Sequence, residues 1–115
     1  IVIRRGIAKR YSDEIDNPLI QTPVWDHKIK SHVFHLYVIR CKKRDKLKEY
    51  LFQNGVETII HYPIPPHKQI AFKEWNKLSF PITEKIHCEV LSLPIGAHLN
   101  ENEIEMIITL INKFK

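Results

Sequence analysis

Apolar residues near the start of the chain recur at every fourth position, which is the spacing of a helix with one buried face. The stripe consists of Ile3, Ile7, Tyr11 and Ile15. The helix should end before Asn17-Pro18, because proline disfavours helical backbone at the residue before it. The pattern is already established at Ile1, with no capping residue and no initiator methionine. We therefore expect residues 1–16 to be the tail of a longer helix between two domains.

The end of the chain has the clearest helical pattern. Asn100 and Glu103 have the spacing of a capping box, in which each side chain accepts a hydrogen bond from the other residue's backbone N–H. A wide apolar stripe follows, made of Ile104, Ile107, Ile108, Ile111 and Phe114. Other helices are predicted over 45–54, over 69–75, and from Pro81 onward, where Ile82, Ile86 and Val90 share a face.

Residues 32–40, HVFHLYVIR, are largely apolar on both faces when they are placed on a strand. One face carries Phe34, Leu36 and Val38, and the other carries Val33, Tyr37 and Ile39. A strand of this kind is expected inside a sheet that is covered on both faces. Further strands are predicted over 19–24, 56–60 and 91–94. The alternation predicts an α+β domain with a small antiparallel or mixed sheet of three to four strands, covered by helices.

Residues 61–67, HYPIPPH, interrupt this alternation with three prolines, two histidines and a tyrosine. Proline fixes φ and lacks an N–H, so the loop should be stiff and should belong to neither a helix nor an inner strand. Stiff loops at strand ends commonly hold ligand-binding groups, which makes His61, Tyr62 and His67 the candidate binding residues. The residues alone leave a second reading open, in which the loop is only a connection.

Composition narrows the class of protein. The 115 residues suffice for one domain with its own core, and 43% hydrophobic residues exclude a disordered chain. No apolar run approaches the about 18 residues of a membrane span, and no signal-peptide pattern opens the chain. Cys41 and Cys88 stand alone, so we expect two small buried side chains in a reducing compartment and a cytoplasmic protein.

The charge of the chain leaves an alternative function open. There are 18 Lys and Arg against 13 Asp and Glu, a formal charge of +5, and only the run from Arg40 to Lys48 is dense. Such a run is typical of a solvated helix start, but it is also compatible with weak nucleic-acid binding. A stand-alone ligand-binding or regulatory module is a further alternative.

The residue pattern contains no complete catalytic apparatus. Neither cysteine has an activating neighbour, no serine lies in a G-x-S-x-G turn, and the three glycines are isolated. His32 and His35 are three residues apart on a predicted strand, so they point to opposite faces and are not expected to share a metal ion. We therefore predict no metal site and no catalytic residue in this chain, and one loop that faces a ligand.

Four segments together resemble the C-terminal portion of the DegT/DnrJ/EryC1/StrS aminotransferases, which act on nucleotide-linked sugars. They are RRGIAKRY at 4–11, the strand at 32–39, HYPIPPH at 61–67, and LSLPIG at 91–96 followed by His98-Leu99. The resemblance covers almost the entire chain, and the shared order and spacing make it specific. It implies that residues 1–115 form the small C-terminal domain of a fold-type I enzyme and are a fragment of a longer chain.

The resemblance also implies what the longer protein does. It would be a homodimer that transfers an amino group to a keto-sugar nucleotide, with pyridoxal phosphate as cofactor and glutamate as amino donor. The lysine that carries the cofactor would lie in an N-terminal domain, so the fragment alone is expected to be inactive. His61 and Tyr62 would face the sugar nucleotide, with His67 as a further contact. Imidazole and phenol groups can hydrogen-bond sugar hydroxyls or phosphate without a fixed charge.

Overall fold

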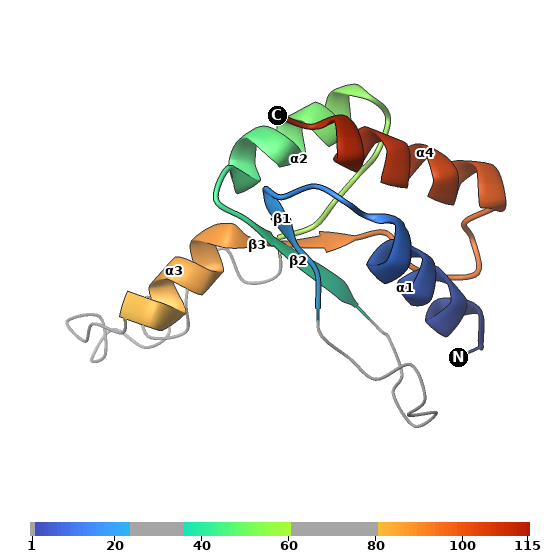
Figure 1. Cartoon of the computed structure of the whole chain (residues 1–115), viewed down its shortest axis with the longest axis horizontal. Helices are drawn as coiled ribbons and strands as arrows, with labels where there is room; N and C mark the ends of the chain where they lie inside the picture. The colour runs from blue at the N-terminus through green and yellow to red at the C-terminus, as the bar shows by residue number, and fades with distance from the viewer. Residues whose placement is uncertain (1, 24–35, 61–80) are drawn as a thin grey trace.

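A three-stranded antiparallel sheet forms the centre of the domain (Figure 1). The computed structural model describes residues 2–23, 36–60 and 81–115. In chain order the elements are α1 (Val2–Glu14), β1 (Ile20–Gln21), β2 (Tyr37–Cys41), α2 (Arg44–Gln53), α3 (Pro81–Glu89), β3 (Val90–Leu93) and α4 (Glu101–Lys113). The strand order is β1-β2-β3, and both pairs are antiparallel. The predicted α+β class with a small antiparallel sheet is confirmed.

The predicted strand over 56–60 is reduced to a single bridge. Ile59 and Ser92 exchange two backbone hydrogen bonds, of 3.2 and 2.8 Å, at the free side of β3. Before this pair the backbone has other partners, because the Val56 N–H donates to the Leu51 carbonyl and the Thr58 carbonyl accepts from Lys48 Nζ. The prediction of a full fourth strand is therefore wrong. The predicted strand over 19–24 is likewise short, since β1 spans only Ile20–Gln21.

The core lies between one face of the sheet and the helices α1, α2 and α4 (Figure 1). Tyr37 and Ile39 of β2 and Leu91 and Leu93 of β3 point into it, in register with each other. The helices contribute Ile7, Ala8, Tyr11, Leu47, Leu51, Ile104, Ile107, Ile108 and Ile111. This confirms the predicted stripes of α2 and α4. In α1 the stripe is buried from Ile7 onward, whereas Ile3 is 56% exposed, so its predicted burial is wrong.

Among the described residues, these three helices cover one face of β2 and not the other, so the prediction of a sheet covered on both faces is confirmed for one face and stays a prediction for the second. Leu36, just before the strand, is 46% exposed, and Val38 is only partly buried. The pattern of apolar residues correctly identified a strand in the middle of the sheet. It could not identify what covers the second face. An apolar side chain indicates that its contact with water is unfavourable, but not which element covers it.

The ends of α1 and α4 are held together by two asparagines. Asn17 is buried, and its Nδ2 donates to the carbonyls of Ile111 and Phe114 at 2.8 and 2.9 Å. Asn112 of α4 acts in the reverse direction: its Nδ2 donates to the Glu14 carbonyl at 2.9 Å, and its Oδ1 accepts from the Asp16 N–H at 2.7 Å. Each helix thus supplies or adjoins the side chain that satisfies carbonyls at the C-terminal end of the other.

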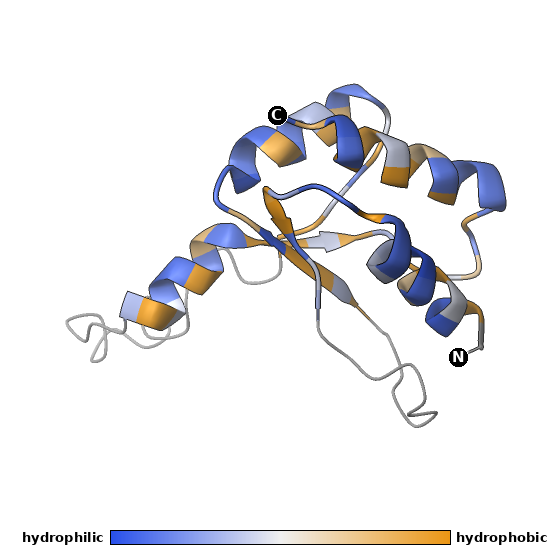
Figure 2. Ribbon diagram, viewed as in Figure 1, coloured by the Kyte–Doolittle hydropathy of each residue, from blue (hydrophilic) through white to orange (hydrophobic). Residues whose placement is uncertain are grey.

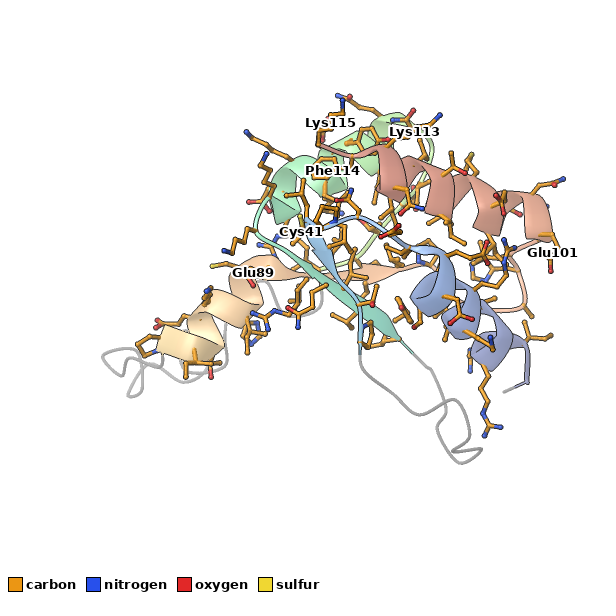
Figure 3. The ribbon with its side chains drawn as sticks, viewed as in Figure 1. Cys41, Glu89, Glu101, Lys113, Phe114 and Lys115 are labelled. Atoms are coloured by element: carbon orange, nitrogen blue, oxygen red, sulfur yellow. The ribbon has the colours of Figure 1, made fainter. Side chains whose placement is uncertain are left out.

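Arg10 joins the same two helices closer to the beginning of α4. Its guanidinium contacts Glu14 at 2.6 Å, Glu105 at 2.6 Å and Glu101 at 3.0 Å. Glu101 lies at the start of α4 (Figure 3), directly after the capping box of Asn100 and Glu103, which is present as predicted. The hydrogen bond from Arg10 lowers the pKa of Glu14. This pair therefore stabilises the fold above the ordinary carboxylate pKa and loses its effect as the pH falls through the lowered value. Its contribution is small, because the pair is partly solvated.

Helix α3 extends away from the sheet (Figure 1), and its apolar residues lie largely outside the core (Figure 2). Ile82 is 79% exposed, although the helix begins at Pro81 as predicted. It ends at Glu89, so the predicted place of Val90 on this helix is wrong, because Val90 begins β3. Cys88 is also exposed, so its predicted burial is wrong, whereas Cys41 is buried as expected. The helical spacing of Ile82 and Ile86 indicates that they share a face, but it does not indicate that this face lies on the core of this domain.

We expect the replacement Asn17→Ala to destabilise the chain by about 2 kcal/mol, because two buried carbonyls lose their donor. Asn54→Ala is the matched control, since Asn54 Nδ2 also donates to a helix carbonyl, that of Tyr50, but in an exposed position. The control should cost less than about 1 kcal/mol. Urea unfolding measures both values. Equal losses for the two variants would show that burial of the Asn17 contacts has no special role.

Candidate functional site

The predicted binding residues His61, Tyr62 and His67 lie outside the described residues, as do the predicted helix over 69–75 and the histidines His32 and His35. The structure does describe the segment that leads to the loop. Residues 55–60 connect the end of α2 to His61 along the free side of β3. The candidate site is therefore built from this segment and from the elements that face it.

The segment begins at a helix end that the sequence predicted. Gly55 has φ +85°, a conformation that glycine adopts without steric cost, and its N–H donates to the Phe52 carbonyl at 3.0 Å. The chain then alternates: Val56 and Thr58 are buried, while Glu57 and Ile59 are exposed. Ile60 packs against the core. The residue just before His61 is thus fixed to the body of the domain.

Lys48 fixes the middle of the segment. Its Nζ donates to the Thr58 carbonyl at 2.7 Å, across the end of α2. With the Ile59–Ser92 bridge, this contact means that the backbone of two consecutive residues, Thr58 and Ile59, is hydrogen-bonded. A hydrogen bond from a charged donor is stronger than one between neutral groups. No pattern in the sequence indicates this contact, because Lys48 is one of several lysines in a run typical of a solvated helix start.

A turn between β3 and α4 faces the segment, and α1 holds it in place. The hydroxyl of buried Tyr11 donates to the Pro94 carbonyl at 2.7 Å, and the Tyr11 ring lies 5.1 Å from that of Tyr37. Burial raises the pKa of Tyr11, so its hydroxyl keeps its proton and remains a donor. The turn follows at Gly96, whose carbonyl accepts from the Leu99 N–H at 3.2 Å.

A groove of about 730 Å³ lies between the segment, this turn and α4. Most of its lining is apolar, with Leu36, Phe52, Val56, Ile59, Leu93, Pro94, Ile95, Leu99, Met106 and Ile107. Its polar side chains include Lys48, Glu57, Thr58, Ser92, His98 and Glu103. Lys48 already donates to a carbonyl, and Glu57 and Glu103 are carboxylates, so the groove suits an apolar group more than an anion.

Thr58 lines the groove but carries a buried hydroxyl without a partner. It is 6% exposed, and among the described residues its Oγ1 is the buried side-chain oxygen for which no partner is found. An unpaired buried hydroxyl costs about 1–3 kcal/mol. The orphan hydroxyl therefore points to a partner other than the described side chains and backbone.

Half of the basic side chains in the run from Arg40 to Lys48 make hydrogen bonds or ion pairs within the domain. Arg40 pairs with Glu89 at 2.8 Å, where α3 meets the sheet (Figure 3), and Arg44 donates to the carbonyls of His87 and Val90 at 2.8 and 3.1 Å. With Lys48 bound to Thr58, half of the run holds α3, β3 and the segment in place. These contacts favour the structural interpretation of the run over the nucleic-acid alternative.

Within residues 2–23, 36–60 and 81–115, no three His, Cys, Asp or Glu side chains come together in a way that could hold a metal ion. None of the described helices has the length and apolar composition needed to cross a membrane.

Comparisons with known proteins agree on one family. The sequence model of the DegT/DnrJ/EryC1/StrS aminotransferase family matches residues 1–112. The chain is 47% identical over 112 residues to a dTDP-3-amino-3,6-dideoxy-alpha-D-galactopyranose transaminase of Aneurinibacillus thermoaerophilus, covering 96% of this chain and 30% of that protein.

Solved structures give the same result. The fold is similar to that of DesV from S. venezuelae, solved in complex with a ketimine intermediate, with a TM-score of 0.86, 32% identity and coverage of 96% of this chain and 30% of DesV. It is also similar to ntda from Bacillus subtilis, solved with bound cofactor PMP, with a TM-score of 0.80, 26% identity and coverage of 94% and 26%. The chain thus spans about 30% of the length of the first relatives that it matches.

We expect Gly96→Ala to destabilise the domain by about 1–2 kcal/mol, because Gly96 has φ +148°, where a side chain is strained. The added Cβ would also lie 2.9 Å from Nδ1 of His98, although this exposed side chain can move. The matched control is Gly6→Ala in α1, where a Cβ meets nothing within 4 Å. That variant should be stabilised by about 0.5–1 kcal/mol. Thermal unfolding measures both, and a stable Gly96→Ala domain would contradict the strain argument.

Proposed function

Because the chain belongs to the DegT/DnrJ/EryC1/StrS aminotransferase family, we propose that it is the C-terminal part of a longer sugar aminotransferase. The observation that carries the proposal is the match over residues 1–112 to proteins of which this chain spans about 30%. The longer protein would transfer an amino group, with glutamate as donor, to a keto-sugar linked to a nucleotide. It would act as a cytoplasmic homodimer.

The proposed cofactor is pyridoxal phosphate, which stabilises the carbanion formed during amino transfer. The described residues do not fit a site for it. The lysine that lines the groove, Lys48, donates to the Thr58 carbonyl, and the beginning of α4 is already closed by its capping box. The carboxylates of Glu57 and Glu103 would repel the cofactor's phosphate. This supports the assignment that the family resemblance implies, in which the cofactor is bound mainly by the part of the longer protein outside this chain.

The role proposed for this chain is to hold one wall of the sugar-nucleotide pocket. His61 and Tyr62 would hydrogen-bond the substrate, and His67 would be a further contact. The anchored segment supports this proposal, because Ile59 is bridged to Ser92 and Ile60 packs against the core immediately before His61. The prolines predicted to stiffen residues 61–67 would add to this, and positioning of functional groups is what substrate binding requires.

We expect the 115-residue chain to form no stable adduct with pyridoxal phosphate, because the described residues offer the cofactor no site. The chain is mixed with the cofactor, reduced with borohydride and analysed by mass spectrometry of its peptides. Low-level modification spread over several surface lysines is the expected result. Stoichiometric modification of a single lysine, with a matching absorbance band before reduction, would refute the assignment of cofactor binding to another part of the protein.

In the longer protein, His61→Ala and Tyr62→Phe should each raise KM for the sugar nucleotide about tenfold, the effect of one lost hydrogen bond of about 1.4 kcal/mol. His87→Ala on α3 and Tyr50→Phe are the matched controls. Tyr50 donates to the Leu110 carbonyl at 2.7 Å, so its variant should lose stability without a change in KM. Steady-state kinetics and thermal unfolding separate the two effects. If His61 and Tyr62 can both be replaced without a change in turnover or KM, the loop is only a connection.

A further inference from the structure

Asn54 and Gly55 form an exposed Asn-Gly pair at the C-terminal end of α2. In such a pair the glycine nitrogen can attack Cγ of the asparagine, because glycine has no Cβ to hinder the approach. The N–Cγ bond forms, the Cγ–Nδ2 bond breaks, and ammonia leaves with the amide proton, which gives a succinimide. Addition of one water molecule then opens this ring to aspartate or to isoaspartate. This chemistry makes asparagine a thermolabile residue.

The folded chain keeps the two reacting groups of this pair apart. The Gly55 N–H donates to the Phe52 carbonyl at 3.0 Å, so the attacking nitrogen is held with its proton in place. Asn54 Nδ2 donates to the Tyr50 carbonyl at 2.8 Å, which turns the side chain back along the helix and away from the Gly55 nitrogen. Both hydrogen bonds must therefore break before the ring can close.

The opening that breaks these bonds can be local. Residues 52–55 are all exposed, and they lie between two buried residues, Leu51 and Val56. Val56 is 3% exposed, and its N–H donates to the Leu51 carbonyl at 2.8 Å, so the chain is fixed again directly after the pair. Exposed helix ends open at a free energy far below that of global unfolding. Residues 52–55 can therefore open while the domain stays folded.

We propose that Asn54 is a site of spontaneous deamidation, closed in the folded chain and opened with the last turn of α2, and that its products loosen residues 55–60. An aspartate cannot donate to the Tyr50 carbonyl, and its charge lies at the negative end of the helix dipole. The last turn of α2 contains no basic residue to offset this charge. Isoaspartate also adds a carbon atom to the backbone just before the segment. The site does not depend on the proposed transamination.

The test follows the conversion of Asn54 by mass spectrometry of peptides, using the protein at its full natural length in mildly alkaline buffer with and without denaturing urea. We expect conversion at least about tenfold slower in the folded protein, because the closed helix end protects the pair. Asn112, which is followed by Lys113, is the internal control and should convert more slowly than Asn54 in urea. Equal rates for Asn54 in both conditions, or no conversion of Asn54 in urea, would overturn the proposal.

Two variants separate local opening from global unfolding. Val56→Ala removes buried atoms directly after the pair and should speed the conversion of Asn54 several-fold in the folded protein. Ile7→Ala is the matched control, because Ile7 is also buried but lies in α1. It should leave the rate unchanged. Equal acceleration by both variants would show that the reaction follows global unfolding and would overturn the local opening.

The effect on residues 55–60 is measured by hydrogen exchange at the Ile59 N–H, which donates to the Ser92 carbonyl at 3.2 Å. We expect exchange several-fold faster in Asn54→Asp than in Asn54→Ala, since both variants lose the bond to Tyr50 but only the aspartate adds a charge. Equal exchange in the two variants would overturn the loosening by charge.

Discussion

Two asparagines determine how the first and last helices of the domain lie. Asn17 closes the end of α4, and Asn112 closes the end of α1, so neither helix end is satisfied unless both helices are in place. Because helix-terminal carbonyls cannot be left buried and unpaired, these contacts fix the two helices side by side, with their C-terminal ends together. Phe114, next to these contacts (Figure 3), then packs 5.4 Å from the ring of Tyr50 and brings α2 into the same layer.

This arrangement reaches the groove through Tyr11. With α1 fixed against α4, the Tyr11 hydroxyl is within 2.7 Å of the Pro94 carbonyl, at the point where β3 leads into the turn. The Tyr37 hydroxyl, 2.8 Å from Ser12 Oγ, ties the middle strand to the same helix. A shift of α1 would therefore move the turn and the sheet together. Residues 1–16, which the sequence suggested as an interdomain helix, are thus physically connected to one wall of the candidate site.

The elements that the sequence predicted well are those whose signals are local. The capping box of Asn100 and Glu103 and the helix end at Gly55 depend on a few neighbouring residues, and both are present. The predictions that fail depend on what lies across from a residue. Ile3 and Ile82 have helical spacing but are exposed, because periodicity gives the face of a helix and not its partner. Cys88 was expected to be buried only because it is an isolated small apolar side chain, and it too is exposed.

The contacts that build the candidate site escaped prediction for the same reason. The bonds from Lys48 to Thr58, from Tyr11 to Pro94 and from Arg44 to Val90 join residues 10, 83 and 46 positions apart. Lysine, tyrosine and arginine are each common on surfaces and in cores, so their identity does not reveal a carbonyl partner. The dense run that suggested nucleic acid is a clear case, since all its charges look free in the sequence and half of them make contacts within the fold.

The segment before His61 shows how a short, irregular connection can be firmly held at the start of the residues proposed to bind substrate. A fourth strand would have used the edge of β3 along its whole length, whereas this segment takes one pair of hydrogen bonds at Ser92 and a charged contact from Lys48. Val56, Thr58 and Ile60 face the core in alternation, so the segment has the inward pattern of a strand without its full ladder. The outward residues, Glu57 and Ile59, remain available at the groove. Residues 56–60 can therefore be anchored to the core by alternate side chains and line the groove with the others. The sequence pattern of a strand is compatible with both roles, because it specifies only the alternation of the side chains.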